Sequence, residues 1–302
     1  MISTKQINEK AVWINIDADI ISARPELFET YQLDDEIVEY ALDRNERARV
    51  EYNRERETFV VIYNVPRLVK QDRHYETVPM TFIVQPNRLI TISNEANSYL
   101  LSRFHRYLEQ YPDETVFNVL FSWLFIISEY YFPLVEEINK ERDHISSLLR
   151  DKTTKQNLLT LSDLEMGMVY FVSATKQNAV VLEQLRTQAV ARRFTEEERE
   201  QLEDALIEAR QLVEMTQLTS QILNQLSGTY NNILNNNLND TMKVLTVLSI
   251  LLTIPTIITG YFGMNIPLPF EGDPAGWLYV IVISIFAFVV GSFVLDKLMN
   301  KN

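Results

Sequence analysis

Residues 244–265 read Val-Leu-Thr-Val-Leu-Ser-Ile-Leu-Leu-Thr-Ile-Pro-Thr-Ile-Ile-Thr-Gly-Tyr-Phe-Gly-Met-Asn. No charged side chain occurs between Val244 and Phe262. A helix of roughly 20 apolar residues is long enough to cross the ~30 Å hydrocarbon core of a bilayer. The sequence therefore predicts a membrane-crossing helix near the C-terminal end of this 302-residue chain.

Small and hydroxyl-bearing residues recur within this apolar segment at steps of three and four, which places them on one face of a helix. We call this set the polar row, and it consists of Thr246, Ser249, Thr253, Thr256 and Gly260. At the same spacing the row continues to Met242 and Asn239 on one side and to Gly263 on the other. Small polar residues on a membrane helix usually face protein or water rather than lipid. The pattern is consistent with helix packing and with the lining of a pore.

The segment ends in Gly263-Met264-Asn265, and a second uncharged span, residues 277–295, follows after a short loop. In this position the tripeptide resembles the signature of the CorA family of divalent-cation channels, which stands at the outer end of the first of two C-terminal membrane helices. The segment 242–246 (Met-Lys-Val-Leu-Thr), Asn239 and Tyr230 are also similar to that family's pattern. The resemblance extends along the whole chain and is most specific between Tyr230 and Asn265.

This resemblance implies a channel for Mg²⁺ influx that also passes Co²⁺ or Ni²⁺, with Gly263, Met264 and Asn265 as its selectivity filter. The implied pore-lining residues are Asn239, Met242, Leu245, Thr246, Ser249, Thr253, Thr256 and Gly260. Among them, Met242 and Leu245 would form a hydrophobic gate that closes by dewetting. One pore helix per chain cannot enclose a channel, so a cyclic homo-oligomer is required. The resemblance implies that this oligomer is a pentamer.

The chemistry of magnesium agrees with this assignment. Mg²⁺ gives up its waters reluctantly, so a filter for the hydrated ion should offer neutral oxygens to those waters, because carboxylates would hold the ion too tightly for it to leave. The Asn265 amide and the Gly263 carbonyl supply such oxygens. In the following loop, Glu271 and Asp273 would raise the cation concentration at the pore mouth. We expect Mg²⁺ as the transported and the regulatory ion, and no organic cofactor.

The family is also regulated by divalent ions that bind between subunits of the cytosolic domain and favour closure. Counting back from Asn239 assigns one regulatory carboxylate to Asp204. The other would precede a segment that resembles residues 47–51 (Arg-Ala-Arg-Val-Glu), where Tyr40 stands in place of the family's acid. Glu39 and Asp43 are the adjacent substitutes.

The rest of the chain divides into a mixed α/β part and a helical part. Short runs rich in branched and aromatic residues predict strands at 11–16, 59–63, 80–84 and 89–92, with a tight turn at 86–88. Helices are predicted at 25–42, 99–111, 114–150 and 156–193, and a final one runs from residue 196 without a proline until Pro255. Thr195 and Glu198 form a capping box at the start of this last helix. The N-terminal part shows no sequence motif of an enzyme.

The predicted fold class is an α+β membrane protein with an N-terminal cytosolic α/β domain, a long helical stalk and two C-terminal transmembrane helices. The expected segments are a cytosolic α/β domain (1–112), a cytosolic helical hairpin (113–195), the stalk part of the pore helix (196–243), the first transmembrane segment with its filter (244–265), an external loop (266–276), the second transmembrane segment (277–295) and a cytosolic tail (296–302).

Composition and charge narrow the partners and the location. The net charge is −13 and there is no cysteine, which argues against nucleic acid as a partner and excludes disulfides. No signal peptide is evident. Lys243, Lys297 and Lys301 flank the spans on one side, whereas the loop on the other side has no base. By the positive-inside rule, both termini are cytoplasmic in a multi-pass protein of the cell membrane, in contact with lipid.

Two alternative functions stay open at this stage. A transporter of the same superfamily tuned to zinc usually lacks the methionine of the motif, so Met264 argues against it. A membrane-anchored coiled-coil scaffold that transports nothing has no need of Thr253, Thr256 and Asn265 on one face.

Overall fold

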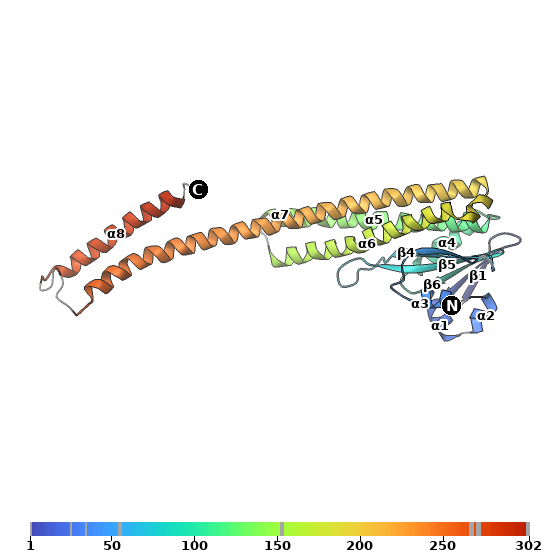
Figure 1. Ribbon diagram of the computed structural model, residues 1–302, viewed down its shortest axis with the longest axis horizontal. Helices are drawn as coiled ribbons and strands as arrows, with labels where there is room; N and C mark the ends of the chain where they lie inside the picture. Colours follow the sequence, from blue (N-terminus) through green and yellow to red (C-terminus); the bar gives the residue numbers. More distant parts are fainter. Residues whose placement is uncertain are drawn as a thin grey trace. The chain divides into compact units, whose positions relative to one another are not determined.

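The computed structural model describes residues 2–24, 26–33, 35–53, 56–151, 154–265, 269 and 273–299. The chain forms two compact units, residues 1–228 and residues 229–302. Helix α7 (Glu196–Phe262) begins in the first unit and ends in the second. Figure 1 shows these elements.

The first unit is built on a six-stranded sheet with the strand order β1-β2-β6-β5-β4-β3. Its strands are β1 (Ile2–Gln6), β2 (Val12–Asp17), β3 (Arg49–Asn53), β4 (Thr58–Pro66), β5 (Thr77–Gln85) and β6 (Arg88–Ser93). Neighbouring strands are antiparallel, except that β2 and β6 are parallel. The central strands β4, β5 and β6 are buried along most of their length, because helices cover both faces of the sheet.

One face of the sheet carries three short helices, α1 (Ala18–Ala23), α2 (Glu26–Tyr31) and α3 (Asp35–Leu42). Isoleucines of the strands, such as Ile16 and Ile62, pack there with Ile37 of α3. The opposite face carries α4 (Tyr99–Gln110), α5 (Val116–Asp151) and α6 (Lys155–Thr187). Its core contains Trp123, whose ring stacks on that of Phe104 with centroids 4.2 Å apart.

Helix α7 contacts α5 and α6: Thr219 Oγ1 lies 3.4 Å from Asn139 Oδ1 of α5, and Thr216 Oγ1 lies 3.1 Å from Thr175 Oγ1 of α6. A short 3₁₀ helix (Ala189–Arg193) leads into α7. The predicted capping box is confirmed: the Glu198 backbone N–H donates to Thr195 Oγ1 at 3.1 Å, and the Thr195 N–H donates to Glu198 Oε2 at 2.9 Å. Leu202, Leu206, Leu212 and Leu223 along this part of α7 are buried, whereas Leu218 is 59% exposed. The buried leucines attach α7 to the helical layer.

The structure also corrects several expected elements. The helix predicted for 25–42 is two helices, because Gln32 adopts a left-handed conformation with φ of 56° that ends α2. Strands β1 and β3 were not predicted, since both lie at sheet edges and neither contains a continuous run of branched or aromatic residues. Helix α6 ends at Thr187 rather than near Arg193. The tight turn predicted at 86–88 is confirmed by the antiparallel pairing of Gln85 with Arg88, which makes β5 and β6 a hairpin.

The second unit contains the C-terminal part of α7 and helix α8 (Gly276–Met299). Of the described helices, three are long and apolar enough to cross a membrane: α5, α7 and α8. In α5, 72% of the most apolar window is buried, whereas the corresponding windows of α7 and α8 are not buried at all. The apolar residues of α5 thus form a protein core, and those of α7 and α8 have no such cover. This agrees with the predicted fold class of an α/β unit followed by a long helix and two C-terminal apolar helices.

Candidate functional site

The polar row lies on an open face of α7 in the second unit. All five of its members are exposed, and so are Asn239, Met242, Leu245 and Gly263, which extend or flank it. Among the described residues, no atom outside the local helix backbone lies within 4 Å of the position that a Cβ at Gly260 would take. The predicted pore-lining residues therefore share one face of a continuous helix that the rest of the described chain leaves uncovered.

Helix α8 covers a different face of α7. Leu251 is 9% exposed, and a Cβ added at Gly291 of α8 would lie 2.6 Å from Ile254 Cδ1 and 3.8 Å from Leu251 Cδ2. Ser284, one of the small residues on this face of α8, is also 9% exposed, as expected where membrane helices approach closely. With 3.6 residues per turn, Leu251 lies on the side of α7 opposite to the polar row. The covered and the open faces of α7 are thus distinct.

The hydroxyl groups of the polar row donate to the backbone of their own helix. Thr246, Ser249, Thr253 and Thr256 each donate to the carbonyl four residues earlier, all at 2.8 Å. A hydroxyl that has donated its proton retains two acceptor lone pairs. The row consequently presents hydrogen-bond acceptors, which suit the water protons of a hydrated cation.

The outer end of α7 carries the Gly-Met-Asn tripeptide. The helix ends at Phe262, the Gly263 N–H donates to the Thr259 carbonyl at 2.9 Å, and Met264 and Asn265 are exposed. In the following loop, Glu271 lies outside the described residues. Asp273 is exposed and accepts the Ala275 N–H at 2.9 Å, so its carboxylate helps to start α8. Sequence reasoning assigned it only to the pore mouth.

At the other end of the row, Met242 and Leu245 are 64% and 61% exposed. Two apolar side chains at this level interrupt the polar face. Beside them, Lys243 Nζ lies 3.3 Å from the Asp240 carboxylate.

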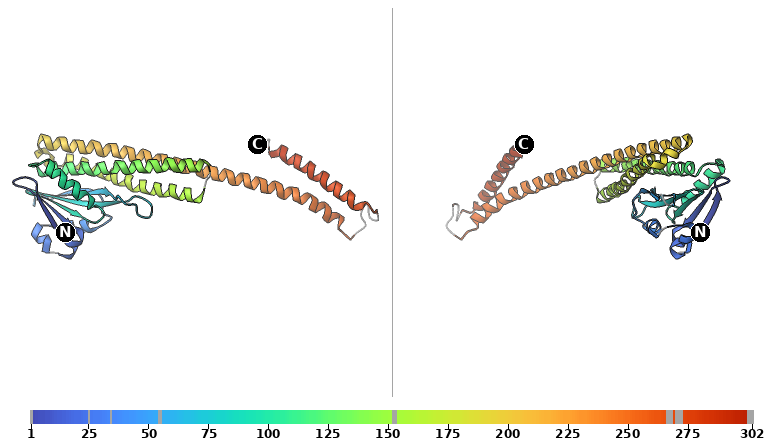
Figure 2. Two further views of the ribbon diagram at one scale, coloured as in Figure 1. Left: turned by 180° about the vertical axis from the view of Figure 1, so that it is seen from behind. Right: turned by 45° about the vertical axis from the view of Figure 1, so that its right-hand side comes forward.

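The three predicted regulatory carboxylates do not come together in one chain. Asp204 is exposed on α7, whereas Glu39 on α3 and Asp43 just after it lie in the layer beyond the sheet. Figure 2 shows the short N-terminal helices, in blue, and the start of α7, in yellow, on opposite sides of the sheet. Within the described residues, no group of three or more potential metal ligands is placed to hold an ion. Carboxylate oxygens are suitable donors for Mg²⁺, but a complete site would require groups from more than one copy.

Sequence reasoning did not foresee the environment of Tyr40. The Arg49 guanidinium carbon lies 3.6 Å from the centroid of the Tyr40 ring. The Tyr40 hydroxyl donates to the Glu36 carboxylate, a hydrogen bond that raises the pKa of Tyr40. Arg49 lies within the segment 47–51 that carried the resemblance, but no local pattern signals that its side chain turns back onto α3.

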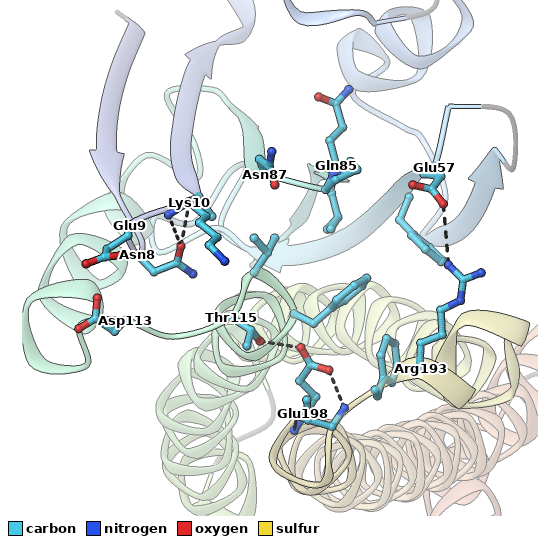
Figure 3. Close-up of a pocket in the computed structure, with 18 of the residues that line it drawn as sticks. Asn8, Glu9, Lys10, Glu57, Gln85, Asn87, Asp113, Thr115, Arg193 and Glu198 are labelled. Atoms are coloured by element: carbon cyan, nitrogen blue, oxygen red, sulfur yellow. Dashed lines mark hydrogen bonds and ion pairs between the residues drawn. The ribbon is translucent and has the colours of Figure 1, made fainter.

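A cavity of about 710 Å³ opens at one edge of the sheet, where the N-terminal ends of α5 and α7 meet. Figure 3 shows some of its polar groups paired: Thr115 with Glu198, Arg193 with Glu57, and Asn8 with the backbone at Lys10. The Glu198 carboxylate, which is 6% exposed, accepts from Thr115 Oγ1 at 2.6 Å and from the Thr195 N–H. Arg193 lies 3.8 Å from Glu57. The Glu198 carboxylate thus connects the N-terminal end of α7 to that of α5, and we call this contact the joint between the two helices.

The chain matches known proteins of one family along nearly its whole length. A family model described as CorA-like Mg²⁺ transporter protein matches residues 8–297. The cobalt/magnesium transport protein CorA of Methanocaldococcus jannaschii is 25% identical over 263 residues, which is 83% of this chain and 81% of that protein.

Solved structures show the same fold. The complete structure of the CorA magnesium transporter from Methanocaldococcus jannaschii matches with a TM-score of 0.79 at 21% identity, over 94% of this chain and 90% of that one. The full-length CmaX protein matches with a TM-score of 0.69 at 15% identity, over 95% and 90% of the two chains. The predicted family and fold are confirmed.

Proposed function

Because the chain belongs to the family of CorA-like Mg²⁺ transporters, we propose that it mediates the influx of hydrated Mg²⁺, and of Co²⁺ or Ni²⁺, through a pore shared by several copies. Its family is one of transport proteins, so the chain is not an enzyme. In this proposal, Gly263, Met264 and Asn265 select the ion.

The observation that carries the proposal is the open polar face of α7 opposite the face that α8 covers. One helix cannot surround an ion, so the polar rows of symmetry-related copies must face a common axis. Helix α8 then lies outside, with its exposed apolar side chains toward lipid. Five copies are the number that the resemblance implies.

Permeation would use neutral oxygens throughout. The Asn265 amides and Gly263 carbonyls accept protons from the waters around the ion, so Mg²⁺ keeps the hydration shell that it releases reluctantly. The hydroxyls of the polar row offer further acceptors along the helix, since their protons are already donated to backbone carbonyls. Weak, repeated contacts of this kind let an ion enter and leave.

Closure would occur at the inner end of the row. A ring of Met242 and Leu245 side chains lacks hydrogen-bonding groups, so a small narrowing there would empty the pore of water and stop hydrated ions. An ion in the cytoplasm would favour this state by binding between copies, held by Asp204 of one copy and by Glu39 or Asp43 of the next.

The proposed orientation places both termini in the cytoplasm of a cell whose plasma membrane contains the protein. Lys243 and Lys297 then lie at the inner surface, in accordance with the positive-inside rule. Asp273 and Glu271 would lie at the external mouth and attract cations. Neither the zinc-transporter nor the scaffold alternative is favoured by the family match.

The test is Mg²⁺ entry into liposomes that contain the purified protein and an entrapped indicator dye, with and without external cobalt hexammine. This complex mimics hydrated Mg²⁺ and does not exchange its ligands, so we expect it to block entry. Asn265→Ala should abolish entry while the oligomer stays intact by size-exclusion chromatography.

The matched control is Asn237→Ala, which removes an exposed amide from the same helix but away from the polar row. Its entry rate should stay close to that of the unmodified protein. If Asn265→Ala conducts normally, Asn265 is not the filter. If an intact oligomer shows no entry at any internal Mg²⁺ concentration, the transport proposal fails for this ion.

A further inference from the structure

Two oppositely charged side chains stand at the end of the second unit that lies away from the Gly-Met-Asn tripeptide. Asp240 and Lys243 are one turn apart on α7, and the Lys243 Nζ lies 3.3 Å from the Asp240 carboxylate. The side chains are 71% and 68% exposed, respectively. An ion pair this open to solvent contributes little to stability, and both groups retain further hydrogen-bonding capacity. We call these two residues the charged pair.

An apolar cavity of about 490 Å³ begins at the charged pair. Beyond the pair it is lined by four apolar residues of the span, Val244, Val247, Leu248 and Leu251. With 3.6 residues per turn, these positions lie on the side of α7 opposite to the polar row. In the proposed channel the polar rows face a common axis, so the apolar cavity faces outward, toward lipid.

A second cavity, of about 700 Å³, shares Asp240, Lys243 and Val247 with the first. It reaches Leu295 of α8 and also Thr246 of the polar row. Because a member of the polar row lines this second cavity, other copies would cover it in an oligomer. The described residues that line the apolar cavity include no member of the row, so the apolar cavity stays open to the membrane.

We propose that the apolar cavity and the charged pair form a binding site for a phospholipid whose headgroup carries a phosphate and a primary ammonium, as in phosphatidylethanolamine. Lys243 binds the phosphate, Asp240 accepts hydrogen bonds from the ammonium, and an acyl chain lies along the apolar residues. The inference rests on the proposed function only in that α7 and α8 cross a membrane and the polar rows face one another. It adds a lipid ligand to that function.

The choice of headgroup follows from charge complementarity. Lysines near a membrane surface attract anionic headgroups, but here the Asp240 carboxylate beside Lys243 repels a headgroup with a net negative charge. A primary ammonium offsets this repulsion and donates charge-assisted hydrogen bonds to the carboxylate. The quaternary ammonium of phosphatidylcholine has no N–H group to donate. The charged pair therefore favours phosphatidylethanolamine over both phosphatidylglycerol and phosphatidylcholine.

The test is lipid-dependent melting of the delipidated full-length protein in detergent. Phosphatidylethanolamine, phosphatidylcholine and phosphatidylglycerol with identical acyl chains are each titrated in mixed micelles, and the lipid fraction that gives half of the stabilisation is recorded. We expect this fraction to be at least about fivefold lower for phosphatidylethanolamine than for the other two, because it alone satisfies both members of the charged pair. Native mass spectrometry counts the lipids that stay bound to each oligomer.

Two substitutions separate the roles of the charged pair. Asp240→Asn removes the partner of the ammonium, so phosphatidylglycerol should stabilise this variant at least as well as phosphatidylethanolamine does. Lys243→Gln removes the partner of the phosphate and should weaken the binding of all three lipids by about fivefold. The matched control is Lys297→Gln, because Lys297 is an exposed residue at the same end of α8 and is not among the described residues that line either cavity. The control should keep the lipid preference of the unmodified protein.

Several results would overturn the proposal. Equal stabilisation by the three lipids would show that the headgroup is not recognised, and an unchanged preference in Asp240→Asn would place the lipid elsewhere. Val247→Trp fills the apolar cavity and should abolish the preference. If this variant instead breaks the oligomer in size-exclusion chromatography and keeps the preference, the cavity is a contact between copies.

Ion flux measured on the same preparations in liposomes keeps the two proposals apart. An intact oligomer that prefers phosphatidylethanolamine but passes no ion would retain the lipid site and lose the transport function. An oligomer that passes Mg²⁺ with no lipid preference would retain the transport function and lose the lipid site.

Discussion

The two parts of helix α7 place similar residues in opposite surroundings. In residues 196–228, leucines such as Leu206 are buried against the helical layer, and Thr216 Oγ1 lies 3.1 Å from Thr175 Oγ1 of α6. In residues 229–262, Leu248 is 51% exposed, and the hydroxyls bond to their own helix. The leucines of the first part are buried by other helices of the same chain. The second part has an exposed face that only lipid or other copies can cover, and this face carries the proposed ion path.

The largest difference in stability should appear when a large apolar side chain is removed from a buried and from an exposed position. Trp123 is fully buried in the first unit, so Trp123→Ala should cost about 3–5 kcal/mol of its stability through lost burial and a cavity. Phe293 on α8 is 70% exposed, and Phe293→Ala should cost less than about 0.5 kcal/mol in detergent. Thermal melting of the full chain measures both, and equal losses would show that α8 is as closely packed as the core.

The joint at the start of α7 gives the next largest effect. Glu198→Ala removes the acceptor of Thr115 Oγ1 and of the Thr195 N–H, so it should destabilise the first unit by about 1–3 kcal/mol. Glu197→Ala is the matched control, because Glu197 is exposed in the same turn. Denaturant titration should separate the two variants, and equal midpoints would mean that the joint contributes nothing to stability.

Two glycines distinguish the covered face of the second unit from its open face. Gly291→Leu forces side-chain atoms against Ile254 and should destabilise the α7–α8 pair by at least about 1 kcal/mol. Gly260→Ala meets no atom within 4 Å and should stabilise the helix by up to about 1 kcal/mol. The test is melting of the detergent-solubilised protein together with its ion flux. Destabilisation by Gly260→Ala would mean that another copy packs tightly against this glycine.

Sequence reasoning identified the features that depend on local pattern. The capping box of Thr195 and Glu198, the tight turn between β5 and β6 and the shared face of the polar row follow from spacing alone, because neighbours along a helix or a hairpin meet through fixed geometry. Contacts that depend on tertiary structure could not be predicted from local spacing. The stacking of Arg49 on Tyr40 depends on how β3 pairs at the sheet edge, and the second bond of Glu198, to Thr115, joins residues 83 positions apart.

The same limit applies to the candidate site. Periodicity predicted which residues share a face of α7, and the structure adds which face α8 covers. Whether Asp204 meets Glu39 or Asp43 depends on the arrangement of copies, which the pattern of one chain does not contain. The roles of these residues and of the filter stay predictions.

The smallest expected effect comes from single hydroxyls of α7. Thr253→Val keeps the shape of the side chain but removes an acceptor from the polar row, so Mg²⁺ entry should slow by about threefold, because the neighbouring hydroxyls still bind the waters of the ion. Thr259 also donates to the carbonyl four residues earlier, at 2.9 Å, but it lies off the row. Thr259→Val should therefore leave entry unchanged in the same liposome assay. Equal slowing by both variants would mean that the two faces of the helix are equivalent to the ion, and that the polar row is a packing surface rather than the lining of a pore.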